Sequence, residues 1–310
     1  MKTDMLGLNF NSLFDLLRTF DSEQTCIEYL EEIRWNGNPI SPFSPNSKVY
    51  KCAENKYRCK DTGKYFNAKT DTMFDSTKIK LQKWYMAIWL ITSHKKGISS
   101  HQLAKDIDVT QKTAWFMLQR IRNCFDIENN HTLDNNVEAD ETFVGGLEKN
   151  KHANKRTEGT QGRSCKTKTP IFGMVERGGK LVAKKVKTTA SEYLTPEMVK
   201  HIKAGATLYT DEWIGYHNIS EIYNHLFVNH SEKQYVKNDI YTNTVEGFWS
   251  LFKRGIVGIY HFTSKKHLQK YVDEFVFRYN TRNFATETAR FDYLLKNVSN
   301  KYLPYKALIV

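Results

Sequence analysis

The stretch YTDEWIGYHNI, Tyr209 to Ile219, decides how the second half of this sequence folds. A short apolar run, Ala206 to Tyr209, leads into it, and Asp211 and Glu212 follow almost directly. An apolar run of this length that ends at polar residues is typical of a strand. A carboxylate just past a strand either caps a following helix or binds a ligand together with residues from elsewhere in the chain. The surrounding pattern decides between these two interpretations.

The segments around this strand predict a mixed α/β sheet. Residues 134–146 have the pattern of a strand that ends in two glycines, and residues 170–177 and 180–187 have the pattern of a hairpin with a Gly-Gly turn. The other predicted elements are a helix over residues 195–203, a strand over Leu226 to Asn229, and helices over Asn243 to Arg254 and Lys266 to Tyr279. Elements in this order favour a mixed sheet, in which carboxylates such as Asp140 and Asp211 gather at strand ends.

Residues 243–255, NTVEGFWSLFKRG, predict an amphipathic helix with polar groups on one face. At about 100° per residue, one narrow arc carries Asn243, Glu246, Ser250 and Lys253, and the other side carries Val245, Phe248, Trp249 and Phe252. An ordinary surface helix has the same pattern, so amphipathicity alone identifies no site. Two Asp from strands and one Glu from a helix are nevertheless the hard oxygen ligands that Mg²⁺ prefers. Cleavage or transfer of a DNA phosphodiester is helped by two such ions about 4 Å apart.

The first 125 residues predict smaller modules. Residues 8–35 have the spacing of two short amphipathic helices, and residues 36–75, with three prolines and short Tyr- and Lys-rich strands, indicate a small β module. Residues 97–123 predict two short helices joined by a tight turn, with a serine and Thr110 as their N-caps. This is the layout of a helix-turn-helix, although many helix pairs that do not bind DNA share it.

The charge of the chain favours nucleic acid as a partner. The 310 residues carry a formal net charge of +12, and the pI is near 9.3. Residues 147–169 hold seven Lys or Arg against two Glu, which suits a loop along a phosphate backbone but also an ordinary solvated loop. The sequence has no apolar run of about 18 residues, no secretion signal and an odd number of cysteines. We therefore expect a cytoplasmic protein with reduced thiols and no membrane partner.

Three segments carry a resemblance to a known family. VEADETFVGG (137–146), LYTDEWIGYHNI (208–219) and the block from NTVEGFW to YNTRN (243–283) are similar to the core of bacterial insertion-sequence transposases with a DDE triad. Residues 35–122 resemble the zinc-ribbon and helix-turn-helix region of the same group. The resemblance implies a ribonuclease-H-like fold and cut-or-copy chemistry at DNA ends. The expected domains are N-terminal helices (1–35), a ribbon-like β module (36–75), a helix-turn-helix region (76–125) and a catalytic domain (133–310).

The resemblance assigns roles to five residues. The implied triad is Asp140, Asp211 and Glu246, and Glu246 follows Asp211 by 35 residues, as in many DDE recombinases. Lys253 matches the basic residue of the family's extended pattern, two helical turns after Glu246. Asn243 matches an asparagine expected to support a metal-bound water or a phosphate. Two Mg²⁺ or Mn²⁺ ions are the implied cofactors.

Neighbouring residues complete the predicted site. Glu138 shares a strand face with Asp140 and is an auxiliary candidate, whereas Glu141 and Glu212 should point away. Double-stranded DNA, as terminal inverted repeats and as target, is the implied partner, and a DNA-induced dimer is a family-based expectation. The residues expected to contact DNA are Thr110, Gln111, Lys112, Arg120, Lys155, Arg156 and Arg254. Those expected in the core are Trp213, Tyr216 and Trp249.

The front module departs from the family in its metal ligands. The family's ribbon carries two CxxC pairs, but this sequence has Ser41 and Ser44 at the first and Cys59 and Thr62 at the second. Cys52 lies too far along the chain from Cys59 to form such a pair. We therefore expect a ribbon-shaped module without zinc, held together by Tyr50, Tyr57, Tyr65 and Phe66.

Three functions are compatible with these residues. The leading hypothesis is a transposase that binds the terminal repeats of its own element and performs strand cleavage and strand transfer. A metal-dependent nuclease without strand transfer would use the same carboxylates. A DNA-binding regulator derived from a transposase would keep the helix-turn-helix, but it has no need of clustered carboxylates, which repel DNA.

Overall fold

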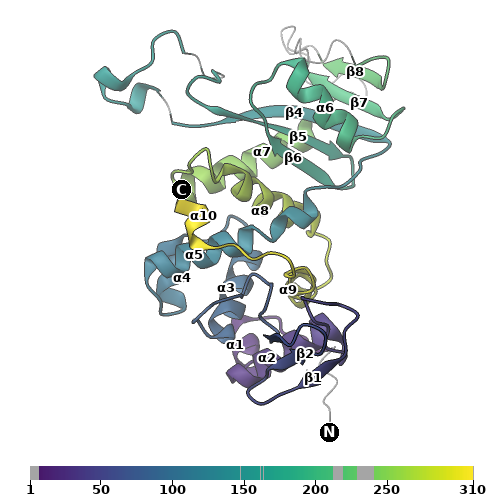
Figure 1. The fold of residues 1–310 in the computed structure, drawn as a ribbon. Coiled ribbons are helices and arrows are strands. Elements are labelled where there is room, and N and C mark those ends of the chain that lie inside the picture. Colours follow the sequence, from purple (N-terminus) through teal and green to yellow (C-terminus); the bar gives the residue numbers. More distant parts are fainter. Residues whose placement is uncertain are drawn as a thin grey trace. The chain divides into compact units, whose positions relative to one another are not determined.

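The computed structural model describes residues 7–146, 148–160, 162, 164–211, 219–228 and 241–309. The chain divides into two compact units, one formed by residues 1–124 with 283–310 and the other by residues 125–282 (Figure 1). In the described ranges, no helix has the length and the apolar character needed to cross a membrane.

The first unit is mainly helical. Its elements are α1 (Leu13–Thr19), α2 (Glu23–Trp35), β1 (Val49–Lys51), β2 (Tyr57–Cys59), β3 (Tyr65–Phe66), α3 (Leu81–Ser93), α4 (Ser100–Asp106), α5 (Gln111–Arg122), α9 (Glu287–Lys296) and α10 (Tyr305–Ile309). The side chains of Ser99 and Thr110 accept hydrogen bonds from the backbone amides of Gln102 and Thr113, and so cap α4 and α5. Both caps of the helix-turn-helix layout agree with the sequence prediction.

Residues 283–310 complete the first unit. α9 packs on α2 and α3, and its buried Phe291 contacts the rings of Phe20 and Tyr85. The hydroxyl of Thr288 accepts a hydrogen bond from the amide of Phe10 at 2.9 Å. The α/β unit therefore ends near residue 282, which differs from the predicted bounds of 133–310. The reason is a long-range match of apolar faces, which local sequence patterns do not reveal.

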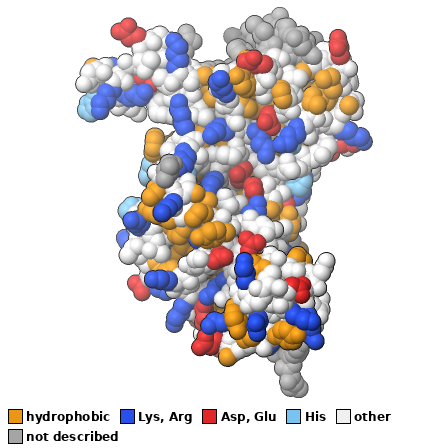
Figure 2. All heavy atoms as spheres, in the orientation of Figure 1, with side chains coloured by type: hydrophobic (Ala, Val, Ile, Leu, Met, Phe, Trp, Pro, Cys, Tyr) orange, Lys and Arg blue, Asp and Glu red, His pale blue; other side chains and the backbone are white. Residues whose placement is uncertain are grey.

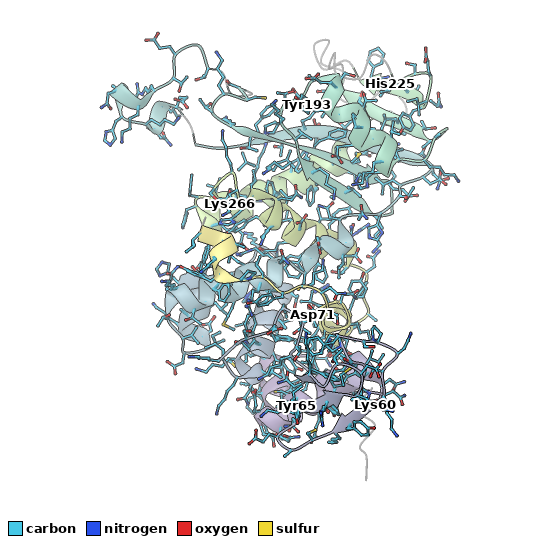
Figure 3. All side chains as sticks on the ribbon, viewed as in Figure 1. Lys60, Tyr65, Asp71, Tyr193, His225 and Lys266 are labelled. Carbon is cyan, nitrogen blue, oxygen red and sulfur yellow. The ribbon has the colours of Figure 1, made fainter. Side chains whose placement is uncertain are left out.

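The β module is a three-stranded antiparallel sheet in the order β1-β2-β3. Its core is an aromatic cluster in which Trp35 makes edge contacts with Tyr57 and Phe66, at centroid distances of 5.3 and 5.9 Å. Tyr50 and Tyr65 were expected in this core, but they are 43% and 59% exposed (Tyr65 is labelled in Figure 3). That expectation was wrong for both residues, because each pairs with Arg58 in the ladder and shares its exposed face, whereas Trp35 of α2 packs on the opposite face.

Hydroxyl groups surround the one cysteine kept from the two CxxC pairs. The side chain of Ser41 is buried and accepts hydrogen bonds from the amides of Phe43 and Ser44 at 3.2 and 3.4 Å. Hydrogen bonds from the hydroxyls of Ser41, Ser47 and Thr62 lower the pKa of the buried Cys59 thiol. The turn around Ser41 is thus held by hydrogen bonds to a serine oxygen.

The second unit alternates strands and helices. Its elements are η1 (Phe125–Glu128), β4 (Asn136–Val144), η2 (Glu148–Asn150), η3 (Ala153–Lys155), β5 (Thr169–Glu176), β6 (Leu181–Lys185), α6 (Ser191–His201), β7 (Thr207–Asp211), β8 (Asn224–Val228), α7 (Asn243–Gly255), the π-helix η6 (Ile256–Tyr260) and α8 (Leu268–Asn280). The helix expected from residue 195 begins four residues earlier, at Ser191. Asn229, the expected end of the last strand, lies outside the described residues.

The five strands form one mixed sheet in the order β6-β5-β4-β7-β8. β4, β5 and β6 pair antiparallel, whereas β4, β7 and β8 pair parallel. This strand order is that of a ribonuclease-H-like fold, and the mixed α/β class is confirmed. Val137 and Ala139 pack with Leu194 and Met198 of α6 on one face, and α7 and α8 cover the other face. Glu138 and Asp140, which alternate with Val137 and Ala139 along β4, therefore lie on the α7 side.

Candidate active site

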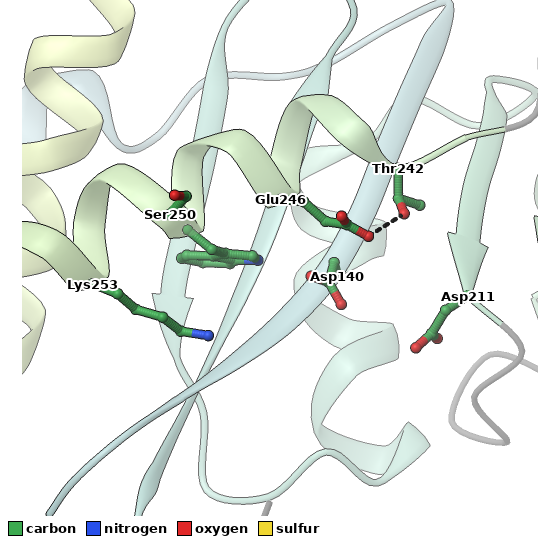
Figure 4. A pocket seen from close by; sticks show the side chains of 7 residues that line it. Asp140, Asp211, Thr242, Glu246, Ser250 and Lys253 are labelled. Atoms are coloured by element: carbon green, nitrogen blue, oxygen red, sulfur yellow. Dashed lines mark hydrogen bonds between the residues drawn. The ribbon is translucent and has the colours of Figure 1, made fainter. Parts of the chain in front are cut away.

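Four of the predicted site residues line one pocket. Asp140 of β4, Asp211 at the end of β7, and Glu246 and Lys253 of α7 face the same space (Figure 4). Its volume is about 460 Å³, and its other lining residues are Thr242, Trp249 and Ser250. The structure thus brings together side chains that are up to 113 positions apart along the chain, counted from Asp140 to Lys253.

Strand register places the two aspartates side by side. β4 and β7 run parallel, and their last paired residues are Glu138 and Tyr209. Asp140 and Asp211 each follow two residues later, so both point to the same face of the sheet. Asp211 is thus the last residue of its strand and lines the pocket instead of capping a described helix.

Helix α7 brings the third carboxylate over the sheet. Glu246 lies in the first turn and accepts a hydrogen bond from the hydroxyl of Thr242 at 3.2 Å. Ser250 and Lys253 follow on the same helical face and also line the pocket, as the predicted arc requires. Asn243 shares that arc but is exposed and is not among the lining residues.

Trp249 forms the apolar wall of the pocket. It is 3% exposed, which confirms the prediction that it belongs to the core. Gly173, the partner of Asp140 in the β4–β5 ladder, leaves the space that the indole occupies. The indole nitrogen is buried and has no hydrogen-bond partner among the residues that the structure describes. The indole N–H thus lies buried in the wall that Trp249 forms beside the pocket.

The donor set suits hard divalent cations. Asp140, Asp211 and Glu246 offer only oxygen atoms, which are the ligands that Mg²⁺ and Mn²⁺ accept. Within the described ranges, no three Asp, Glu, His or Cys side chains converge closely enough to hold one ion between them. The carboxylates fit such ions as part of a shell that water and phosphate oxygens complete.

Two of the remaining acidic candidates, Glu138 and Glu141, do not line the pocket. Glu138 is on the same face of β4 as Asp140, as predicted, but it lies outside the pocket lining and accepts a hydrogen bond from Arg177 at 2.9 Å. Glu141 alternates to the other face and is not a lining residue. Glu212, and with it Trp213 and Tyr216, lies outside the described residues.

In the helix-turn-helix, one predicted DNA contact was wrong. Arg120 is only 3% exposed, and its guanidinium donates hydrogen bonds to the carbonyl oxygens of Met73, Asp75 and Leu303. It ties α5 to neighbouring segments and is not available to DNA. By contrast, Thr110, Gln111 and Lys112 lie at the exposed start of α5. Arg120 differs from these three residues in its place along α5, because the start of the helix is exposed whereas residues 117–122 are buried.

Three further basic candidates are exposed on the second unit. Arg156 donates hydrogen bonds to the carbonyl oxygens of Lys151 and Lys149 at 3.1 and 3.0 Å, and Lys155 is exposed beside it. Arg254 of α7 is exposed and donates to the carbonyl oxygen of Ser250 at 3.2 Å. On the face seen in Figure 2, Lys and Arg side chains are spread over both units instead of forming one patch.

Comparison with known proteins relates the chain to mobile genetic elements. Residues 132–280 match the family of ISXO2-like transposase domains. A protein in transposable element ISH50 of Halobacterium salinarum is 28% identical over 275 residues, which cover 84% of this chain and 92% of that protein.

Two solved structures are more distant. The Mos1 strand transfer complex covers 71% of this chain and 79% of its own, at 12% identity and a TM-score of 0.27. A pre-cleavage Mos1 transpososome covers 67% and 76%, at 14% identity and a TM-score of 0.23. TM-scores this low do not bear on the fold, so the similarity rests on the family match and on the relative. Residues 132–280 thus resemble an ISXO2-like transposase domain, and the chain is similar over most of its length to a protein of a transposable element.

Proposed function

We propose that the chain cleaves DNA at the terminal inverted repeats of its element and joins the ends to target DNA. In this proposal Asp140, Asp211 and Glu246 are the ligands of two Mg²⁺ or Mn²⁺ ions. The observation that carries it is the pocket in which these three carboxylates meet Lys253. Carboxylates repel DNA, so a lysine beside three of them suits a site where cations and phosphate are bound together.

The proposed chemistry is an in-line attack on a phosphodiester, carried out twice. Water first attacks phosphorus at the element end, and the bond from phosphorus to the 3′ oxygen breaks, which leaves a 3′ hydroxyl. That hydroxyl then attacks a phosphorus of the target, and the target's own bond to its 3′ oxygen breaks. Bound divalent ions activate the attacking oxygen and stabilise the leaving oxygen in such reactions.

The side chains of the pocket have separate tasks in this proposal. Lys253 binds a phosphate oxygen as a point charge and fixes the register of the strand at the carboxylates. The indole ring of Trp249 forms the apolar wall of the pocket beside the carboxylates. Asn243, at the exposed start of α7, binds the DNA backbone at the rim. Thr110, Gln111 and Lys112 of α5 read the terminal repeat, and Lys155, Arg156 and Arg254 bind phosphates.

The proposal is tested with a labelled duplex that ends in the element's own terminal repeat, incubated with Mg²⁺ and an unlabelled target duplex. Wild type should give cleaved product and product joined to the target, whereas Glu246→Gln should give neither. Glu192→Gln is a matched control, because Glu192 also lies in the first turn of a helix of the same unit but does not line the pocket. It should behave as wild type.

Other results of this experiment would favour one of the two competing functions. Cleavage without joining in wild type would favour a nuclease without strand transfer. Tight binding of the terminal repeat with no metal-dependent product would favour a DNA-binding regulator. Size measurement with and without the duplex tests whether DNA induces a dimer.

A further inference from the structure

Glu138 is a buried carboxylate beside the pocket that the chemistry above does not use. Its side chain is fully buried, and it lies on β4 two residues before Asp140. Burying a carboxylate is costly unless several hydrogen bonds compensate for the lost water. The partners of Glu138 therefore show what this position is used for.

The first set of partners belongs to the start of α7. One oxygen of Glu138 accepts hydrogen bonds from the backbone amides of Thr244 and Val245 at 2.8 and 3.1 Å. The other oxygen accepts from the hydroxyl of Thr244 at 2.9 Å. Thr242, at the N-cap position, does not cap the helix and donates instead to Glu246. The carboxylate of Glu138, on a strand, thus replaces an N-cap side chain of α7. Its negative charge is also stabilised by the positive end of the helix dipole.

The second partner is Arg177, which follows β5. Its Nε donates to Glu138 at 2.9 Å, and its Nη2 donates to the carbonyl oxygen of Tyr241 at 2.8 Å. The guanidinium lies over the rings of Tyr209 and Tyr241, with centroid distances of 3.9 and 3.7 Å. Arg177 therefore joins β4, β7 and the segment that leads into α7.

These contacts have a regular relation to the three pocket carboxylates. Glu138, Tyr209 and Thr244 stand two positions before Asp140, Asp211 and Glu246, respectively. Glu138 and Tyr209 are also the last paired residues of β4 and β7. Because alternate residues of a strand share one face, the contacts lie next to the pocket on its side of the sheet. One ion pair thus touches all three elements that carry a pocket carboxylate.

We propose that Glu138 and Arg177 are positioning residues that set the placement of Glu246 relative to Asp140 and Asp211. The proposal rests on the proposed function, since it concerns how these three carboxylates bind divalent ions. The ion pair of Glu138 and Arg177 does more than stabilise the fold. It fixes the distance between α7 and the sheet, and this distance determines the affinity of the three carboxylates for divalent ions. Changing residues that orient metal ligands typically weakens metal affinity about 10- to 100-fold.

The test measures Mn²⁺ binding to the full chain by electron paramagnetic resonance, together with urea unfolding of each variant. Glu138→Gln removes the charge and keeps the shape. The double variant Glu138→Gln/Arg177→Gln also removes the partly buried cation that loses its carboxylate partner in the single variant, so it is the version expected to fold if the single variant does not. Glu128→Gln is the matched control, because Glu128 is equally buried in the same unit and binds Lys180 at 3.0 Å, away from the pocket lining.

The expected result is a Mn²⁺ dissociation constant raised about 10-fold or more in the Glu138 variants, with the control unchanged from wild type. Equal Mn²⁺ affinity in wild type and in the folded double variant would overturn the positioning role, even if stability falls. An equal loss of affinity in Glu128→Gln would overturn it too, because the effect would then follow stability alone. If wild type itself binds no Mn²⁺ through Asp140, as judged by Asp140→Asn, the proposed function fails and the positioning role with it.

Discussion

Gly173 lies so close to the indole of Trp249 that a Cβ at this glycine would be 2.5 Å from Cζ2 of the ring. Gly173 pairs with Asp140 across the β4–β5 ladder, and Trp249 lies one turn after Glu246 on α7. The absence of a side chain at one position of β5 thus allows α7 to approach the sheet at the pocket.

Gly173→Ala should therefore damage both stability and the site. Forcing a methyl group against the ring costs about 1–3 kcal/mol of unfolding free energy. It also displaces α7, so metal-dependent cleavage should fall more than the loss of folded protein explains. Urea unfolding and cleavage kinetics measure the two effects. Gly247→Ala is the control: nothing lies within 4 Å of its Cβ position, and it should gain about 0.5–1 kcal/mol.

Lys253 and Arg254 provide a matched pair of neighbouring cations on α7. Both are exposed, but only Lys253 lines the pocket. Lys253→Ala should lower the cleavage rate constant about 100-fold, because it removes a charge at the reacting phosphate. Arg254→Ala should leave that rate constant within about threefold and reduce the salt slope of binding by about 1. Equal rate losses in both variants would contradict a specific role for Lys253.

Arg120 and Lys112 are two cations of α5 with different expected roles: Arg120 stabilises the fold, and Lys112 contacts DNA. Arg120→Ala leaves three carbonyl oxygens without their donor, of which that of Met73 is buried, so the free energy of unfolding should drop by about 2–5 kcal/mol. Lys112→Ala should change stability by less than about 0.5 kcal/mol and weaken binding to the terminal repeat. Fluorescence anisotropy and urea unfolding of both variants give the comparison. A stable Arg120→Ala variant with weakened DNA binding would restore the original prediction for this residue.

Asp273 should make stability depend on pH. Burial raises its pKa to about 6, although Asn129 and Gln269 donate hydrogen bonds to it. The folded state therefore retains a proton that the unfolded chain, with a pKa near 3.8, has lost. The contribution of Asp273 to stability is greatest below pH 4 and declines as the pH rises to 6.

Asp273→Asn should remove this decline, so that the stability difference between variant and wild type changes by about 1–3 kcal/mol between pH 4 and pH 6.5. Unfolding curves at a series of pH values measure it. Asp134→Asn should give a small effect of opposite sign and only below about pH 4, because a hydrogen bond from Lys203 lowers the pKa of the exposed Asp134 from 3.8. A pH-independent difference for Asp273→Asn would show that this carboxyl titrates normally.

Much of the site could be predicted because it depends on local patterns. The apolar run before Asp211 indicates its strand, and the periodicity of residues 243–255 places Glu246, Ser250 and Lys253 on one face. Only the resemblance implies Asp140 as their partner, since spacing along the chain does not tell which strand ends meet. Only the structure shows that β4 pairs in parallel with β7, which brings the ends of these two strands together.

What could not be predicted depends on contacts between distant residues. Arg120 has the sequence context of an exposed helix residue, and only the carbonyl groups of Met73, Asp75 and Leu303 make it structural. The capping of α7 by Glu138 joins residues 106 positions apart. A strand carboxylate that caps a helix from another part of the chain leaves no local signal, because capping patterns are sought beside the helix itself.

The first unit is built from both ends of the chain, and this determines the order in which the two units are able to fold during synthesis. The second unit is one continuous segment, residues 125–282, and all of it has been translated before α9 is made. The first unit has to wait for residues 283–310, so the part that leaves the ribosome first is the last to be completed. Until then α2 and α3 lack the apolar partner that α9 provides, and a nascent chain interrupted near residue 282 would expose that surface to chaperones and proteases.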